Sequence, residues 1–82
     1  MRKDRTLVEI GKRIQNVRLD LDISQEELAT QAGLHRTYMG MVERGERNIT
    51  IINLLRIATA LGVEAGTLLH GMRVKPKDAW NA

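Results

Sequence analysis

Apolar residues recur at three- and four-residue steps along most of the chain, which is the spacing of one face of an α-helix. The first series consists of Leu7, Ile10, Ile14, Val17 and Leu21. It predicts a helix over about residues 6–21, with polar side chains on the opposite face. No segment alternates apolar and polar residues and no hairpin turn is present, so the sequence predicts no strands.

A capping box marks the start of the second predicted helix. Ser24 and Glu27 have the required spacing: the serine hydroxyl accepts from the third backbone N–H, and the glutamate reaches back to the serine. Gly33 ends this helix, because glycine adopts positive φ without steric cost. The buried side of the helix is expected to consist of Leu28, Ala29 and Ala32.

Two further helices of different character follow. The third is predicted over about residues 35–44 and ends at Gly45, although His35 is a poor residue to cap it. The fourth is predicted over about residues 51–61, with Thr50 as its cap. Its core stripe is expected to consist of Ile51, Leu54, Ile57, Ala58 and Leu61.

Glu64 opens a short fifth helix that is predicted to reach about His70. After it, Pro76 and a low apolar content predict an extended, mobile tail. The predicted fold class is therefore all-α, a compact bundle of five helices. It has one domain over residues 1–71 and a tail over residues 72–82.

Composition adds less than the pattern does. A chain of 82 residues fits one domain of a size at which self-association commonly adds stability. Its formal charge of +3 resides in the termini, because residues 6–70 carry seven basic and eight acidic side chains. The chain has no cysteine and no apolar run near the ~20 residues that cross a bilayer. We therefore expect a cytoplasmic protein, while Trp80 in the tail has no assigned role.

Residues 24–45 have the organisation of two short helices joined by a turn that includes a glycine. Ala29 supplies the small side chain that a steep crossing requires, and Met39 and Val42 face inward from the second helix. The opposite stripe consists of Arg36, Thr37, Gly40, Met41 and Arg44. These residue types suit a base-lined groove, where arginine pairs with guanine and the threonine methyl meets thymine. The pattern predicts a helix-turn-helix that reads double-stranded DNA.

The order of these pieces resembles the phage-repressor and Cro-like (XRE-type) regulators, which share the lambda-repressor-like fold. The likeness covers about residues 7–70 and rests on Ser24-Gln25-Glu26-Glu27-Leu28-Ala29, Ala32-Gly33-Leu34, Val42-Glu43-Arg44-Gly45 and Ile57-Ala58-Thr59-Ala60-Leu61-Gly62-Val63. Together with Val42 to Asn48, the run His35-Arg36-Thr37-Tyr38 is similar to the controller proteins of restriction–modification systems. Those proteins are homodimers that bind paired operator sites and time expression of their own gene and the endonuclease gene. The resemblance thus implies a transcription regulator located with the bacterial nucleoid.

By position, the resemblance also implies which residues meet the duplex. The base-contacting residues would be Arg36, Thr37, Gly40 and Met41. The backbone-contacting residues would be Gln25, Tyr38, Arg44, Arg47 and Asn48. Gln25 would bind phosphate at a helix N-terminus, where backbone N–H groups favour anions.

Some of these residues have a second interpretation. Tyr38 could instead pack against the first helix, and Arg44 and Arg47 could pair with Glu43 and Glu46 on the surface. Such exposed ion pairs contribute little stability. Gly40 costs about 1 kcal/mol of helix propensity. We expect that cost where a side chain would strike DNA.

The fourth helix carries more apolar residues than one intramolecular face needs. Ile52 and Leu55 lie beside its core stripe, and Val63 and Leu68 would extend the same patch or belong to the core. We expect a two-fold dimer through the C-terminal helices, acting on a roughly palindromic operator. The alternative is that Ile52 and Leu55 only cover the core.

Other functional classes find little support in the sequence. No nucleophile–base pair, paired carboxylates or ligand cluster is visible, so we expect neither an enzyme nor a cofactor. His35 and His70 stand alone, which argues against a metal site. A phage-type repressor and an antitoxin-like regulator share the fold and remain alternatives, although only about twelve residues follow the fifth helix for a toxin-binding extension. RNA polymerase is a further candidate partner.

Overall fold

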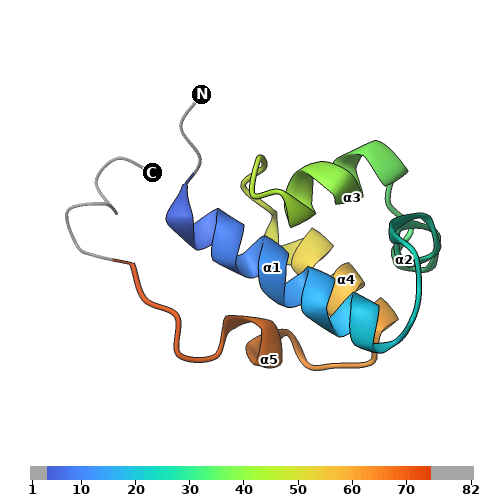
Figure 1. Ribbon diagram of the computed structural model, residues 1–82. Coiled ribbons are helices and arrows are strands. Elements are labelled where there is room, and N and C mark those ends of the chain that lie inside the picture. The colour runs from blue at the N-terminus through green and yellow to red at the C-terminus, as the bar shows by residue number, and fades with distance from the viewer. Residues whose placement is uncertain (1–3, 75–82) are drawn as a thin grey trace.

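A computed structural model describes residues 4–74, and this part of the chain folds into five helices without a strand. Figure 1 shows them as α1 (Arg5–Asp20), α2 (Gln25–Ala32), α3 (Arg36–Glu43), α4 (Ile51–Leu61) and α5 (Ala65–Leu69). The predicted all-α, five-helix fold is confirmed, and each helix lies within one or two residues of its predicted bounds. Most of the predicted tail, including Trp80, lies outside the described residues. Met72, the first tail residue, packs against the core.

Side-chain caps explain where the helices begin. The Ser24 hydroxyl accepts from the Glu27 N–H at 3.0 Å while the Glu27 carboxylate accepts from the Ser24 N–H at 2.9 Å, which confirms the capping box. Thr50 accepts from the Asn53 N–H at 3.0 Å, as predicted. Asp4, which was not predicted as a cap, accepts from two N–H groups of the first turn of α1.

The core lies between the four longer helices and is closed by α5. Here α2 packs against both α3 and α4, while α1 packs against α3 and α5. The fully buried large side chains are Ile14, Leu28, Met39, Ile57 and Leu68. Two residues assigned to buried stripes are instead exposed. Leu21 follows the end of α1, where the helical face no longer points inward, and Ile51 occupies the first turn of α4, beyond the reach of the core.

Two glycines allow the backbones of α1 and α3 to touch. A Cβ on Gly11 would lie 2.5 Å from the carbonyl oxygens of both Val42 and Glu43. Gly45 has φ of +74°, and a Cβ there would lie 2.7 Å from the Val8 Cα. The N-terminal half of α1 therefore rests directly on the C-terminal end of α3, a contact that only glycine permits.

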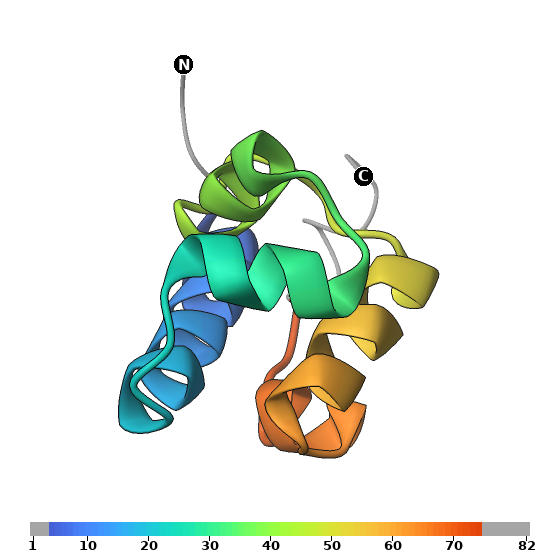
Figure 2. The same ribbon diagram turned by 90° about the vertical axis from the view of Figure 1, so that its right-hand side faces the viewer.

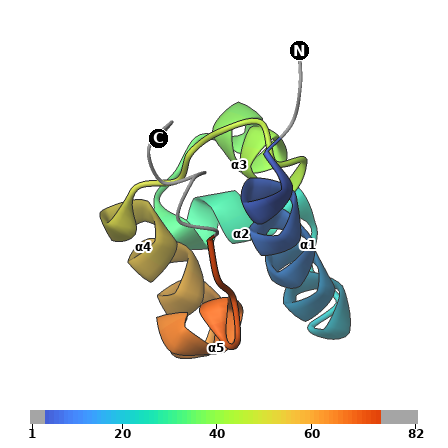
Figure 3. The same cartoon turned by 90° about the vertical axis from the view of Figure 1, so that its left-hand side faces the viewer.

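The three ribbon views agree on the placement of the remaining elements. In Figures 1, 2 and 3, α3 lies at the upper edge of the molecule, and α5 lies at the lower edge with the end of α4. Figure 3 shows α1 and α4 on opposite sides, with α2 between them. The helix predicted to read DNA thus forms one edge of the domain.

Candidate nucleic-acid interface

The turn between α2 and α3 has the geometry that the sequence predicts. Gly33 ends α2 in the left-handed region with φ of +70°. The Leu34 N–H donates to the Ala29 carbonyl at 2.9 Å and the Gly33 N–H to the Thr30 carbonyl at 3.2 Å, which is the Schellman arrangement. Ala29 is buried. Figure 2 shows the result: α2 lies across the molecule and α3 stands above it, viewed nearly end-on.

Helix α3 divides into a buried and an exposed face. Its buried residues are Met39, Gly40, Val42 and Glu43. Arg36 and Thr37 are exposed and Met41 is half-buried, and their contact with bases stays a prediction. Within residues 4–74, Arg36 is tethered only by a surface ion pair with Glu26 at 3.4 Å, in which both side chains are 69% exposed. An exposed pair of this kind contributes little and leaves Arg36 available to a ligand.

Gly40 does not belong to the exposed face. It is buried, and a Cβ there would lie 3.1 Å from Arg44 Nη1 and 3.5 Å from Gln25 Oε1. The contact between Gly40 and DNA therefore stays a prediction, and in this structure the Gln25 and Arg44 side chains lie beside the glycine. The absence of a side chain makes room for the Gln25 amide and the Arg44 guanidinium.

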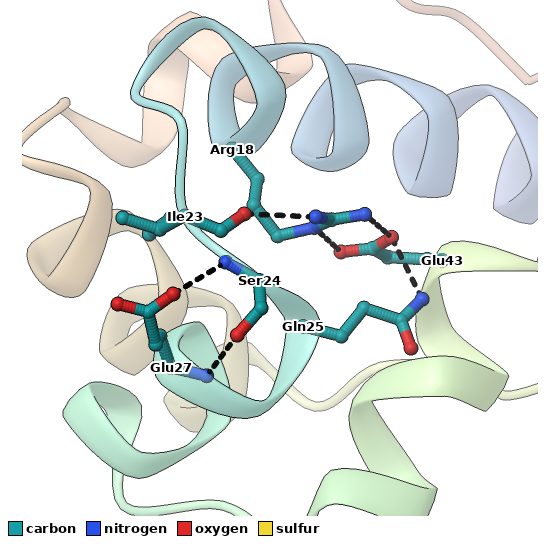
Figure 4. A network of polar contacts seen from close by, with 6 residues as sticks. All are labelled: Arg18, Ile23, Ser24, Gln25, Glu27 and Glu43. Carbon is teal, nitrogen blue, oxygen red and sulfur yellow. Dashed lines mark hydrogen bonds and ion pairs between the residues drawn. The ribbon is translucent and has the colours of Figure 1, made fainter.

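A buried ion pair joins α1 to the last residue of α3. The Arg18 Nε donates to Glu43 Oε2 at 2.7 Å, the Arg18 Nη2 donates to Glu43 Oε1 at 3.0 Å, and Nη1 donates to the Ile23 carbonyl at 2.9 Å (Figure 4). The hydrogen bond to Glu43 raises the pKa of the Arg18 guanidinium above its ordinary value. Gln25 adds a third donor, from its Nε2 to Glu43 Oε1 at 3.0 Å. The alternative in which Glu43 pairs with an arginine on the surface is therefore wrong, because its side chain is 2% exposed.

The position of Arg18 could have indicated this pair. Arg18 lies four residues after Ile14, on the apolar stripe of α1, where a charged side chain requires a buried partner. Glu43 lies next to Val42, and nothing local distinguishes it from the exposed Glu46. The partner could be named only once α1 and α3 were placed side by side.

The arginines after α3 have local partners. Arg44 forms two hydrogen bonds with Glu46, at 3.0 and 3.1 Å, which raise the pKa of its guanidinium. The predicted surface pairing thus involves Glu46 and not Glu43. The Arg47 guanidinium lies over the Tyr38 ring, 5.9 Å from its centre. Asn48 is exposed in the same loop.

Tyr38 is half-buried against the core and hydrogen-bonded to α4. Its hydroxyl accepts from Asn53 Nδ2 at 3.0 Å, while packing of the ring against α1 stays a prediction. The ring is half-buried, with Arg47 on one face. Tyr38 therefore connects the exposed loop that carries Arg47 to the helix that carries the apolar patch.

Comparison with known proteins identifies the arrangement. Residues 14–68 match the helix-turn-helix family. This chain belongs to that family. Its match includes α2, α3 and α4 completely. The chain is thus a helix-turn-helix transcription regulator, as the sequence predicted.

Several relatives of this helix-turn-helix chain are control proteins. It is 43% identical over 60 residues to the control protein C.BamHI of Bacillus amyloliquefaciens. The aligned residues make up 72% of this chain and 74% of that protein. The crystal structure of the restriction-modification controller protein C.AhdI from Aeromonas hydrophila has 47% identity and a TM-score of 0.75, covering 76% of this chain and 94% of that one. A third similar protein is the restriction-modification controller protein C.Esp1396I, which was solved as a tetramer with its natural 35 base-pair operator. It has 33% identity and a TM-score of 0.76, and the match covers 82% of this chain and 88% of that one.

The predicted dimer residues of this helix-turn-helix domain fall into two groups. Ile52 and Leu55 are 61% and 48% exposed, and Ile51 beside them is 76% exposed. Val63 is half-buried against the core, and Leu68 is 1% exposed within it. Leu68 is therefore withdrawn from the proposed interface, because no partner could reach its side chain without unfolding the domain.

The described part of the chain holds no group of three or more histidine, cysteine, aspartate or glutamate residues arranged to bind a metal ion. Within the same residues, no helix combines the length and the apolar content needed to cross a membrane.

Proposed function

We propose that this helix-turn-helix regulator is a restriction–modification controller that binds a palindromic operator as a homodimer. The observation that carries the proposal is the division of α3: half of its residues are buried, and Arg36 and Thr37 stand exposed at the edge of the domain. The similarity to control proteins supports the narrower role, since one such protein was solved as a tetramer on its operator.

In this proposal the exposed end of α3 reads bases. Arg36 can donate two hydrogen bonds to guanine, and Thr37 and Met41 supply apolar contact to a thymine methyl group. The phosphate backbone is contacted by Gln25 at the start of α2 and by Arg44, Arg47 and Asn48 after α3. These contacts to the phosphate backbone position the protein on the duplex without carrying sequence information. Tyr38 holds Arg47 at the margin of the groove.

The proposed dimer forms through α4. Ile51, Ile52 and Leu55 present adjoining apolar side chains to solvent on its first two turns. A second copy related by a two-fold axis would cover them and set two α3 helices one turn of DNA apart, about 34 Å. Reading two half-sites supplies the discrimination that one short helix lacks against a genome of competing sites.

Selection of binding sites from random DNA, at a stated salt concentration, tests the function. We expect enrichment of a sequence with two related half-sites about 10 base pairs apart. Failure to enrich any sequence would contradict the proposal. An adjacent methyltransferase or endonuclease gene would support the controller role. An adjacent toxin gene would favour an antitoxin-like regulator instead, and a location among phage genes would favour a phage-type repressor.

Replacing Arg36 with alanine tests base reading. The variant should fold normally and lose roughly 1–3 kcal/mol of specific binding per half-site, because the guanine contact is removed. Arg36→Lys is the matched control: it keeps the charge but not the two-pronged donor, so it should retain non-specific affinity and lose discrimination. Competition between operator and random duplexes measures both. Unchanged discrimination in the alanine variant would refute the assignment.

Replacing Arg47 with alanine tests the backbone contact. Specific and non-specific binding should weaken alike, and the slope of log affinity against log salt should fall by about one for each phosphate that Arg47 neutralises. Lys12→Ala removes the same charge from the exposed surface of α1 and should leave the slope unchanged. Titration at several salt concentrations gives the slopes. Weaker binding to the operator alone would instead point to base contact by Arg47.

We further propose that the protein acts by binding alone and catalyses no reaction. The helix-turn-helix family consists of DNA-binding regulators, which supports this view. Its place would be the bacterial cytoplasm, at the nucleoid, because its partner is the chromosome. RNA polymerase would be a second partner wherever the operator lies beside a promoter that the protein activates.

A further inference from the structure

Glu43 has more hydrogen bonds than its ion pair with Arg18 requires. The Arg18 guanidinium already engages both carboxylate oxygens, at 2.7 and 3.0 Å. Oxygen Oε1 nevertheless accepts a second hydrogen bond, from Gln25 Nε2 at 3.0 Å. Figure 4 shows the side chains of Arg18 and Gln25 reaching Glu43 from two different helices. Gln25 is the first residue of α2 and the side chain proposed to meet phosphate.

The charge of Glu43 determines which way the Gln25 amide faces. An ionised carboxylate only accepts hydrogen bonds, so the amide must turn its nitrogen toward Glu43 and its oxygen away. The oxygen lies on the side of Gly40, 3.5 Å from where a Cβ would stand, and Arg44 Nη1 lies 3.1 Å from the same point. The Glu43 side chain is 2% exposed and that of Arg18 is 9% exposed. Hydrogen bonds to a charged acceptor of this kind are roughly twice as strong as neutral ones.

We infer that Glu43, held in place by Arg18, is a positioning residue for the contact between Gln25 and a DNA phosphate. The Gln25 nitrogen carries two N–H groups, of which Glu43 takes one and leaves the other for a phosphate oxygen. A freely rotating amide would present its oxygen to the anion half of the time and repel it. The inference rests on the proposed function, since it deepens the role of Gln25 there.

The same contacts connect three elements at the point of DNA contact. Arg18 extends from α1, holds the Ile23 carbonyl just before α2, and fixes the carboxylate at the end of α3. The α2 N-terminus and the recognition helix therefore keep one relative position. A merely structural role for the ion pair would make the fold less stable but would leave each phosphate contact of the folded protein intact.

Ethylation interference on the selected operator separates these roles, because it reports individual phosphates. Gln25→Ala should lose the signal at one phosphate per half-site and weaken operator binding about 10-fold per half-site, as expected for a hydrogen bond to a charged group. Glu43→Leu removes every acceptor atom at position 43, whereas glutamine would keep one, so it should lose the same signal and keep those that depend on Arg47. The Gln25→Ala/Glu43→Leu variant should bind no more weakly than either single variant, since both changes remove the same contact.

Glu43→Leu leaves Arg18 buried without a charged partner and can fail to fold. Arg18→Met combined with Glu43→Leu removes the acceptor without leaving a buried charge, a class of replacement that is often neutral for stability. This variant should be fully folded by circular dichroism and should lose the same phosphate signal as Gln25→Ala.

Three results would overturn the inference. One is a folded Arg18→Met/Glu43→Leu variant that retains the phosphate signal absent from Gln25→Ala. Another is additive losses of affinity in the Gln25→Ala/Glu43→Leu double variant. The third is a Gln25→Ala variant with every signal intact, which would remove Gln25 from the interface while operator binding by the wild type stands. If the wild type selects no operator, the proposed function itself fails.

Discussion

Replacing Leu55 with glutamate is expected to yield a folded monomer that binds its operator at least about 100-fold more weakly, because the two half-site contacts are no longer linked. Leu55 is 48% exposed between the core stripe of α4 and the exposed Ile51 and Ile52. A charge there remains hydrated in the monomer but would be buried without a partner in the dimer, which is strongly unfavourable. Sedimentation measures the mass, and operator titration measures the affinity.

Leu19→Glu is the matched control for this variant. Leu19 is 57% exposed near the end of α1, and Figure 3 shows α1 and α4 on opposite sides of the domain. The same substitution there should leave both mass and affinity nearly unchanged. A wild-type protein that sediments as a monomer at tens of micromolar, or a Leu55→Glu protein that remains dimeric, would show that the interface lies elsewhere.

Arg18→Ala should destabilise the domain by about 3–5 kcal/mol, because it leaves the Glu43 carboxylate buried without its counter-charge. For a domain of this size the loss is a large part of the free energy of unfolding. Because the guanidinium pKa is raised, the part of this stability that is linked to ionisation of Arg18 is lost only as the pH rises into strongly alkaline solution. Chemical denaturation at neutral pH measures the effect.

Lys12→Ala serves as the comparison, since Lys12 is exposed on the same helix and should change stability by no more than about 0.5 kcal/mol. Restoration of stability by the paired change Arg18→Met and Glu43→Leu would confirm that the cost comes from the uncompensated charge. An Arg18→Ala protein as stable as Lys12→Ala would mean that water reaches Glu43 and solvates it.

Features that depend on neighbouring residues in the chain could be predicted from the sequence. The capping box at Ser24 and Glu27, the cap at Thr50 and the left-handed end at Gly33 each involve groups within five residues of one another. Local hydrogen bonding and steric preference decide them, so a residue type at a given spacing suffices. The exposed Arg36 and Thr37 followed from helical periodicity in the same way.

Features that depend on packing between helices could not be predicted in this way. Gly40 and Glu43 lie on α3, but the groups that explain them come from α2, from α1 and from the turn after α3. Periodicity also could not separate the two apolar residues Leu55 and Leu68. One faces solvent and the other is enclosed by the core, because α5 folds back over the bundle.

The division of α3 into two faces also restricts how this protein can acquire a new operator. Four of its eight residues are buried, and one of them, Glu43, is committed to a partner on another helix. Only Arg36, Thr37, Tyr38 and Met41 remain for variation within the helix, and Tyr38 is already bonded to α4. Libraries for altered specificity should therefore randomise three positions and leave the others unchanged. A complete exchange of the helix for that of a relative would have to bring the matching residue at position 18 with it.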